Sequence, residues 1–394
     1  MNKIIILMIS SILFAVNCHN DQDDDSASLL VLAGIGAGQC STIDNCFDRF
    51  SRTADEGASL IITDRNNRTI KEREFGTIAN DRHQIIFSGS KWVTAVTIMR
   101  VIDQNKCNSL NLESTTANVL GWTGTRGTIT MRQLLAFTSG LNDRGGASGQ
   151  DSCIANLPEN ATSAQKDSCV NSIRDNTKND TPGALFVYNS NHMAVAQRMV
   201  EVACNQTWKQ IFQTEVSLPL NWSLTETKWV SGLGGTLGGD GSLAGAYGLI
   251  VSPREYSRLM LALLRSGNAY NGTSDVNGFL SANAVSEILS DQYRGATIGY
   301  SQFSAFGYSW TYGLGNWRYC SNPGNPTECD KDLISHSVGA NGFFPWLDRN
   351  RGYFGIVSVN NQGVKNSLTN LPPTGSSLFF AETIRPMIHN ELNQ

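Results

Sequence analysis

A serine and a lysine three residues apart, in the segment Ser88–Lys91 (SGSK), stand at the start of an apolar-periodic run. Across Trp92–Val101 the apolar residues recur at the spacing of one broad helical face, which predicts a helix of about four turns. Positions three apart share a helix face, so the Lys91 amine can come within hydrogen-bonding distance of the Ser88 hydroxyl. Lysine serves as the base for such a hydroxyl when burial or nearby positive charge lowers its pKa. The spacing therefore places a candidate nucleophile beside a candidate base.

Four residues alone leave this interpretation open. Ser163–Lys166 (SAQK) repeats the spacing in a polar, cysteine-flanked stretch without an apolar period, and we interpret it as a chance match on the surface. For Ser88 the alternative is a serine that caps its helix, with Lys91 on a solvated face. Other segments have to decide between the two.

The first 17 residues predict an export signal, because Lys3 precedes an apolar core over 4–16. Cys18 directly after that core resembles a bacterial lipoprotein cleavage site, where the new N-terminal cysteine carries lipid that holds the protein at a membrane. We therefore expect an exported protein, lipid-anchored in the bacterial cell envelope and periplasmic or surface-facing. The alternative is ordinary secretory cleavage with Cys18 incidental. Residues 18–39 are expected to form a flexible tether, and 40–394 the folded domain, with a helical region over about 100–270.

Nine cysteines are typical of an exported protein, and eight remain to pair if Cys18 is lipidated. The connectivity stays open, although short separations favour the pairs Cys40–Cys46, Cys153–Cys169 and Cys320–Cys329, which leaves Cys107 with Cys204. The cysteines and histidines show no metal-ligand spacing, so no metal site is implied. A net charge of −4 without a basic stripe argues against a nucleic-acid partner.

Period and turn signals predict an α+β fold. We expect residues 142–182 to form an exposed loop, rich in Asn, Asp, Gly and Ser. Strand hairpins are expected over 60–72 and 343–359, and helices over 130–137, 191–204, 207–217, 252–265 and the C-terminal segment. Strands near both ends with helices between them suggest one antiparallel sheet, formed by the N- and C-terminal segments, flanked by helices and carrying a mostly helical insertion.

Four segments, in order, resemble the serine β-lactamase and penicillin-binding-protein superfamily, and within it the class C-like serine hydrolases, which include esterases and D-amino-acid peptidases. Ser88–Lys91 is the first, and 129–141 (ITMRQLLAFTSGL) is similar to the family's T-x-x-x-L-L-x-x-T-S-G-L stretch. Residues 182–190 carry Pro-Gly and then FVYNS, where the family has F-x-Y-x-N, and 335–342 (SHSVGANG) stand where it has K-T-G or H-x-G. The resemblance spans roughly residues 50 to 390 and implies a β-lactamase-like fold.

The resemblance implies roles for three side chains. Ser88 would be the nucleophile and Lys91 would help to deprotonate it. Tyr188 would be a second base, with a pKa lowered by neighbouring ammonium groups, and would pass the proton to the leaving group. The backbone N–H groups of Ser88 and Ala340 would form the oxyanion hole, with Gly339 beside them allowing close approach of the substrate.

The sequence departs from the family pattern at two places. Ser190 stands where asparagine is common, with Asn189 beside it. The register that keeps Gly339 in place puts Ser337 at the usual lysine or histidine position and His336 one residue earlier. Side chains on a strand alternate between faces, so one step decides which of the two faces the site.

These observations predict a serine hydrolase that works through a covalent acyl-enzyme on a small-molecule or peptide-like ester or amide. Cell-wall-like D-amides and β-lactams are not separated from esters, because pocket loops decide between them. No metal or organic cofactor is implied, and the oligomeric state is open. The alternative from another class is a lipid-anchored surface binding protein on the same fold with an impaired site, motivated by Ser190 and the displaced His336.

Overall fold

A computed structural model describes residues 40–142, 152–231, 243–293, 295–304, 308, 310–320, 329, 331–360 and 373–393. The chain divides into two units at Cys40, and the helices and strands described below belong to the second unit, Ser41–Gln394. The expected export signal (1–17), Cys18 and the tether (18–39) lie outside the described residues. Within the described residues, no helix combines the length and apolar character that crossing a membrane requires.

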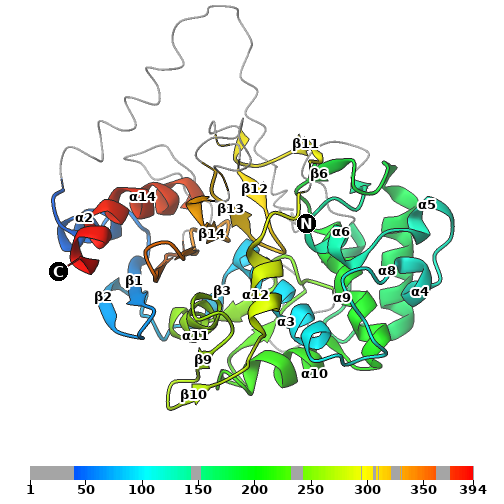
Figure 1. The fold of residues 1–394 in the computed structure, drawn as a ribbon, viewed down its shortest axis with the longest axis horizontal. Coiled ribbons are helices and arrows are strands. Elements are labelled where there is room, and N and C mark those ends of the chain that lie inside the picture. Colours follow the sequence, from blue (N-terminus) through cyan, green and yellow to red (C-terminus); the bar gives the residue numbers. More distant parts are fainter. Residues whose placement is uncertain are drawn as a thin grey trace, which may run out of the picture. The chain divides into compact units, whose positions relative to one another are not determined.

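The two ends of the chain build one antiparallel sheet, as the sequence predicts. The N-terminal hairpin β1–β2 adds to the C-terminal hairpin β15–β16 through β1 and β16, which pair from Ser59↔Ser358 to Asp64↔Tyr353. The order across the sheet is β12-β13-β14-β15-β16-β1-β2 (Figure 1). These strands span Gly57–Asp64 (β1), Thr69–Gly76 (β2), Thr311–Tyr312 (β12), Trp317–Arg318 (β13), Ile334–His336 (β14), Phe344–Asp348 (β15) and Tyr353–Ser358 (β16).

Helices cover both faces of this sheet. Helices α2 (Ile43–Ser51) and α14 (Pro373–Leu392) pack on each other and on the sheet, and α11 (Pro253–Leu264) packs on β1, β15 and β16 from the other side (Figure 1). Every residue of β1 is buried as a result. The fold is therefore α+β, and the core lies on both sides of the central strands.

The segment between the two hairpins is mostly helical, as expected. Its helix starts follow caps that the sequence carries, since Thr130 forms a capping box with Gln133, and Ser252 forms one with Glu255. The helices are η1 (Phe87–Gly89), α3 (Ser90–Asp103), α4 (Thr116–Leu120), α5 (Gly124–Gly127), α6 (Met131–Leu135), α7 (Ser152–Asn156), α8 (Ser163–Asn176), α9 (Asn191–Cys204), α10 (Trp208–Phe212), η2 (Gln213–Ser217) and α12 (Ala282–Leu289).

Short strands connect these helices in small sheets outside the main one. β3 pairs with β8 and β8 with β7, β6 runs parallel to β11, and β4–β5 and β9–β10 are separate pairs. They span Gln84–Ile85 (β3), Leu141–Asn142 (β4), Lys178–Asn179 (β5), Leu185–Val187 (β6), Lys228–Trp229 (β7), Leu249–Val251 (β8), Ala269–Tyr270 (β9), Asp275–Val276 (β10) and Thr297–Tyr300 (β11).

The expected loop over 142–182 is wrong where the structure describes it, because α7 and α8 lie there. Thr162 caps α8 in a capping box with Gln165. The inward positions of α8 include Lys166, whose Nζ lies 2.5 Å from a carboxylate oxygen of Glu201 on α9. A charged residue at an inward position interrupts the apolar pattern by which a helix is predicted. The sequence gives no sign that this charge is buried, because its partner Glu201 lies far away in the chain. Ser163 faces solvent, so the second serine–lysine spacing has no site.

The three disulfides whose partners the structure gives agree with the expected pairs. Cys107–Cys204, Cys153–Cys169 and Cys320–Cys329 are bonded, and Cys40 and Cys46 are also disulfide-bonded. The pair with the largest separation among the first three, 97 residues, joins the turn after α3 to the end of α9. It therefore cross-links two helices that are distant in sequence.

Packing between β15 and β16 depends on Gly355, which is paired with Trp346. A Cβ atom on residue 355 would lie 2.0 Å from Cζ2 of the Trp346 indole. We predict that Gly355→Ala lowers the free energy of unfolding by about 1–3 kcal/mol, because the overpacked indole has to leave its position. Urea denaturation measures the change, and Trp346→Phe should reduce its size. An equal loss with and without the indole would contradict this explanation.

Candidate active site

Ser88 lies in a tight turn directly before helix α3. Short strand β3 leads into η1, and α3 begins at Ser90. Phe87 has a left-handed φ of 46°, which is uncommon for a bulky residue and costs about 1–2 kcal/mol. Such strain persists where surrounding contacts fix the backbone, and it is concentrated at functional sites. The Ser88 side chain that this turn presents is half-buried, and therefore accessible to a small molecule.

Lys91 lies one helical turn further on and is buried, with 3% of its surface exposed. Its Nζ is 3.0 Å from Ser88 Oγ and donates to the Ala246 carbonyl oxygen at 2.8 Å. No carboxylate of the described residues pairs with it. Burial lowers the pKa of Lys91 to about 7, so a large fraction of the amine is neutral near neutral pH and can accept a proton.

Tyr188 follows strand β6 and completes the group. The Lys91 amine lies 4.8 Å from the centre of its ring, and the ring packs against Trp317 and Phe137. Burial raises the pKa of Tyr188, and the nearby Ser88 side chain opposes that rise only in part. The expected lowering of this pKa is therefore wrong. The phenol is surrounded by aromatic rings, and the Lys91 amine beside it is only partly protonated near neutral pH, so the phenol keeps its proton.

His192 is a residue of the site that the sequence interpretation missed. Its Nδ1 lies 2.7 Å from the Ser139 hydroxyl and its Nε2 lies 2.8 Å from the Val187 carbonyl oxygen, directly before Tyr188. Burial, with a smaller contribution from the Lys91 charge, lowers the pKa of His192 to about 4. A neutral ring can donate from Nε2 and accept from the hydroxyl at Nδ1, which fixes the strand that carries Tyr188. The one hint in the sequence was Ser139 of the TSGL stretch, the residue whose hydroxyl contacts His192 in the structure.

The segment after β14 is hydrogen-bonded to the turn that carries Ser88. The Ser337 hydroxyl donates to the Ser88 carbonyl oxygen at 3.0 Å, and the Asn341 side-chain amide donates to the Ile85 carbonyl oxygen at 2.8 Å. A Cβ atom at position 339 would lie 2.2 Å from the Ile86 carbonyl oxygen, which explains the glycine there. Ala340 is exposed next to it, and its part in an oxyanion hole stays a prediction.

The structure places His336 apart from this group. Its ring lies among Trp310, Phe344 and Phe303, at centroid distances of 4.6, 5.3 and 5.7 Å, and lines a small cavity with Arg385 of α14. Burial lowers the pKa of His336 to about 3. Alternation along the strand is the reason, because Ser337, one residue on, is the side chain that contacts the Ser88 turn.

Ser190 and Asn189 occupy the start of α9. Asn189 is buried, donates to the Leu141 carbonyl oxygen at 3.3 Å and accepts from the Asn191 amide. Ser190 precedes the helix, is half-buried and makes no side-chain hydrogen bond within the described residues. Its short hydroxyl is therefore the group in this position that a bound molecule can reach. Across the described ranges, no cluster of three His, Cys, Asp or Glu residues could hold a metal ion.

Comparisons with known proteins show the family of this chain. The family model described as Beta-lactamase matches residues 43–371, which confirms the resemblance stated above. A protein from Bacteroides dorei DSM 17855, assigned as a beta-lactamase, has 24% sequence identity and a TM-score of 0.69, covering 94% of this chain and 99% of its own. No curated protein sequence matches.

Two further solved structures share the fold at lower identity. A LovD9 mutant of simvastatin synthase from Aspergillus terreus is 15% identical with a TM-score of 0.60, covering 88% of this chain and 98% of its own. EstCE1, described as a hydrolase with promiscuous acyltransferase activity, is 16% identical with a TM-score of 0.61, covering 85% and 98%. At these identities the likeness concerns the fold.

Lys91 gives a prediction on both stability and activity. Lys91→Met should lower acylation by about 10²–10⁴-fold, because the base is lost. It should also raise the free energy of unfolding near pH 7, because the buried amine that resists protonation is gone. Between the folded pKa of about 7 and the unfolded pKa of about 10.4, the unfolded wild type binds more protons, so its stability rises with pH. The advantage of the variant should therefore shrink as the pH increases.

Denaturation curves at several pH values measure this effect. Lys166→Met is the matched control, because that lysine is equally buried but its charge is paired with Glu201. Its loss leaves a buried carboxylate with one partner fewer and should lower the stability. A loss of stability in both variants would show that the two lysines have the same electrostatic role.

Proposed function

This chain belongs to the β-lactamase family and is a serine hydrolase, and on that premise we propose that Ser88 is its nucleophile, Lys91 its general base and Tyr188 its proton donor. The observation that carries the proposal is the 3.0 Å contact between the Ser88 hydroxyl and an amine whose pKa burial lowers to about 7. A serine needs such a base within hydrogen-bonding distance to become nucleophilic.

In the first step Ser88 Oγ attacks the carbonyl carbon of the substrate. The Ala246 carbonyl oxygen accepts one N–H of Lys91 and so orients the lone pair of the neutral amine toward the hydroxyl. The hydroxyl proton passes to Lys91 as the new C–O bond forms. The ammonium group then lies against the face of the Tyr188 ring, which stabilises a cation.

In the second half of acylation the leaving group takes a proton. Tyr188 keeps its proton at neutral pH because burial raises its pKa, so its O–H can donate as the bond to the leaving group breaks. The Lys91 ammonium returns a proton to the phenol oxygen, which restores both groups. We propose the backbone N–H groups of Ser88 and Ala340 as donors to the oxyanion, each worth about 3 kcal/mol in the transition state.

Water then attacks the acyl-enzyme and releases the acid, with the same groups acting in reverse. We propose an ester or amide as the substrate, a class that includes cell-wall-like D-amides and β-lactams. The half-buried Ser190 hydroxyl, two residues after Tyr188 in the chain, can bind a polar group of any of these substrates but reaches less far than an amide side chain. The alternative from another class is a binding protein on this fold. The observation that favours it is Ser190, which stands where asparagine is common in the family.

We predict that a fluorophosphonate probe labels the wild-type protein and that Ser88→Ala abolishes the labelling, because the probe reacts with an activated serine. Ser163→Ala is the matched control, since that serine has the same spacing to a lysine but faces solvent, and its labelling should be unchanged. Turnover of p-nitrophenyl esters, nitrocefin and D-alanyl peptides then ranks the substrates. A folded wild-type protein that is not labelled would support the binding protein instead.

We also propose that the protein is exported and held at the bacterial envelope by lipid on Cys18. Support comes from the sequence: Lys3, the apolar core over 4–16 and a cysteine directly after it. Acyl chains contribute about 0.8 kcal/mol per buried CH₂ to membrane binding. We predict that Cys18→Ser moves the protein from the membrane to the soluble fraction and abolishes labelling by a clickable palmitate analogue. Membrane retention of the unlabelled variant would count against the lipid anchor.

A further inference from the structure

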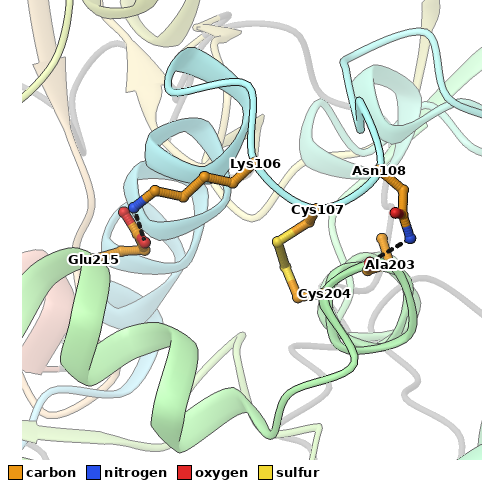
Figure 2. Close-up of a disulfide and its surroundings, with 6 residues drawn as sticks. All are labelled: Lys106, Cys107, Asn108, Ala203, Cys204 and Glu215. Atoms are coloured by element: carbon orange, nitrogen blue, oxygen red, sulfur yellow. Dashed lines mark hydrogen bonds and ion pairs between the residues drawn. A yellow bond between two sulfur atoms is a disulfide. The ribbon is translucent and has the colours of Figure 1, made fainter.

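The two helices that start at the reactive groups are joined at their opposite ends. Ser88 and Lys91 lie at the start of α3, and Tyr188 lies three residues before α9. Each helix has 14 residues, and the two pack against each other. Figure 2 shows the Cys107–Cys204 disulfide that connects the turn after α3 to the last residue of α9, with Cα atoms 4.3 Å apart.

Both helix ends at this junction are rigid. Asn105 and Asn205 each adopt a left-handed φ of 50°. Directly after them, the Lys106 amide donates to the Val101 carbonyl oxygen at 3.0 Å and the Gln206 amide donates to the Glu201 carbonyl oxygen at 3.2 Å. These are the bonds of a Schellman motif, which closes the last turn of a helix. The disulfide therefore joins two defined ends, and not two free tails.

Two polar contacts flank the disulfide (Figure 2). The Asn108 side-chain amide donates to the Ala203 carbonyl oxygen at 3.0 Å, and Lys106 Nζ lies 2.7 Å from a carboxylate oxygen of Glu215. Lys106 is partly exposed, so water competes with Glu215 for its ammonium group. The covalent bond is therefore the dominant constraint at this junction.

A continuous set of contacts leads from the interface between these helices to the base. Thr94 of α3 donates its hydroxyl to the Gly245 carbonyl oxygen at 2.7 Å, and the Gly245 amide donates to the Gln197 side chain of α9 at 2.9 Å. A Cβ atom at position 245 would lie 2.9 Å from that same Gln197 oxygen. The next residue, Ala246, is the one whose carbonyl oxygen holds Lys91. Displacement of α9 along α3 would therefore move the group that orients the base.

We propose that the Cys107–Cys204 disulfide is a positioning element for acylation, which fixes the axial register of α9 against α3 and with it the places of Tyr188 and Ala246 around Lys91. The proposal rests on the proposed roles of Ser88, Lys91 and Tyr188. Neither cysteine touches the reacting groups. Their effect is transmitted through two helices, and catalysis is sensitive to displacements of about 1 Å at the reacting groups.

The position of this disulfide also makes it open to selective reduction. Both cysteines are half-buried and line a cavity of about 520 Å³ that includes Glu215. Each of the other pairs contains at least one buried cysteine: Cys46, Cys169, Cys320 and Cys329. A dithiol reductant reduces the bond to two cysteine thiols and is itself oxidised to its disulfide, and exposed disulfides react first.

The test compares the double variant Cys107→Ser/Cys204→Ser with Cys153→Ser/Cys169→Ser, which removes the disulfide between α7 and α8. Fluorophosphonate labelling and ester turnover are followed against pH, at a temperature where circular dichroism shows both variants folded. We expect the first variant to lose about ten- to a hundredfold in labelling rate and kcat with KM unchanged. Its pH midpoint should rise by about one unit, because water reaches a displaced Lys91. The second variant should keep both values.

A parallel measurement uses the wild-type protein under mild reductant, with mass spectrometry to show which cysteines carry an alkylating label. The rate of fluorophosphonate labelling should fall as the Cys107–Cys204 disulfide is reduced, and it should recover on reoxidation. This measurement tests the proposal even if the double variant does not fold. An unchanged rate and pH midpoint would overturn the positioning role, as would an equal loss in both double variants. Failure of the oxidised wild type to be labelled would instead overturn the proposed function.

Discussion

The site depends on the buried amine of Lys91, which pairs with no carboxylate among the residues that the structure describes. Lys91 donates to a backbone carbonyl oxygen and lies beside a hydroxyl and an aromatic ring, and none of these carries a negative charge. A buried ammonium group in such surroundings is costly, so the pKa falls to about 7 and the amine can act as a base. The reactivity that we propose for Ser88 would follow from this desolvation, since the hydroxyl gains an acceptor for its proton.

A second serine and lysine in this chain can be compared with Ser88 and Lys91. Ser163 and Lys166 repeat the spacing on α8, and Lys166 is also buried, yet Glu201 lies 2.5 Å from its amine. This ion pair joins α8 to α9, which pack against each other. The spacing of serine and lysine is thus common to both segments, and the charge of the neighbouring side chain separates a candidate site from a structural ion pair.

Apolar periodicity and helix caps, which depend on adjacent residues, predicted several helices correctly. The helix over 191–204 and the capped start at Ser252 agree with the structure, because period and caps are encoded in adjacent residues. Properties that depend on contacts between residues far apart in the chain could not be predicted from the sequence. Lys166 concealed α8 because its partner lies on another helix, and the pKa of Tyr188 was expected to fall because its aromatic surroundings could not be seen. His192 was missed because its role depends on Ser139.

Contacts between distant residues also decide which of Ser337 and His336 faces the site, so the sequence alone could not tell the two apart. Such contacts also fix the backbone at Ser88. Three contacts join the segment after β14 to the backbone around Ser88. The Asn341 side-chain amide donates a hydrogen bond to the Ile85 carbonyl oxygen, Gly339 closely approaches Ile86, and the Ser337 hydroxyl donates to the Ser88 carbonyl oxygen. These contacts hold a turn in which Phe87 is strained. A strained turn keeps its shape only while such distant contacts persist, so the geometry at Ser88 is a property of the assembled sheet and helices together, and no short segment of this chain could maintain it alone.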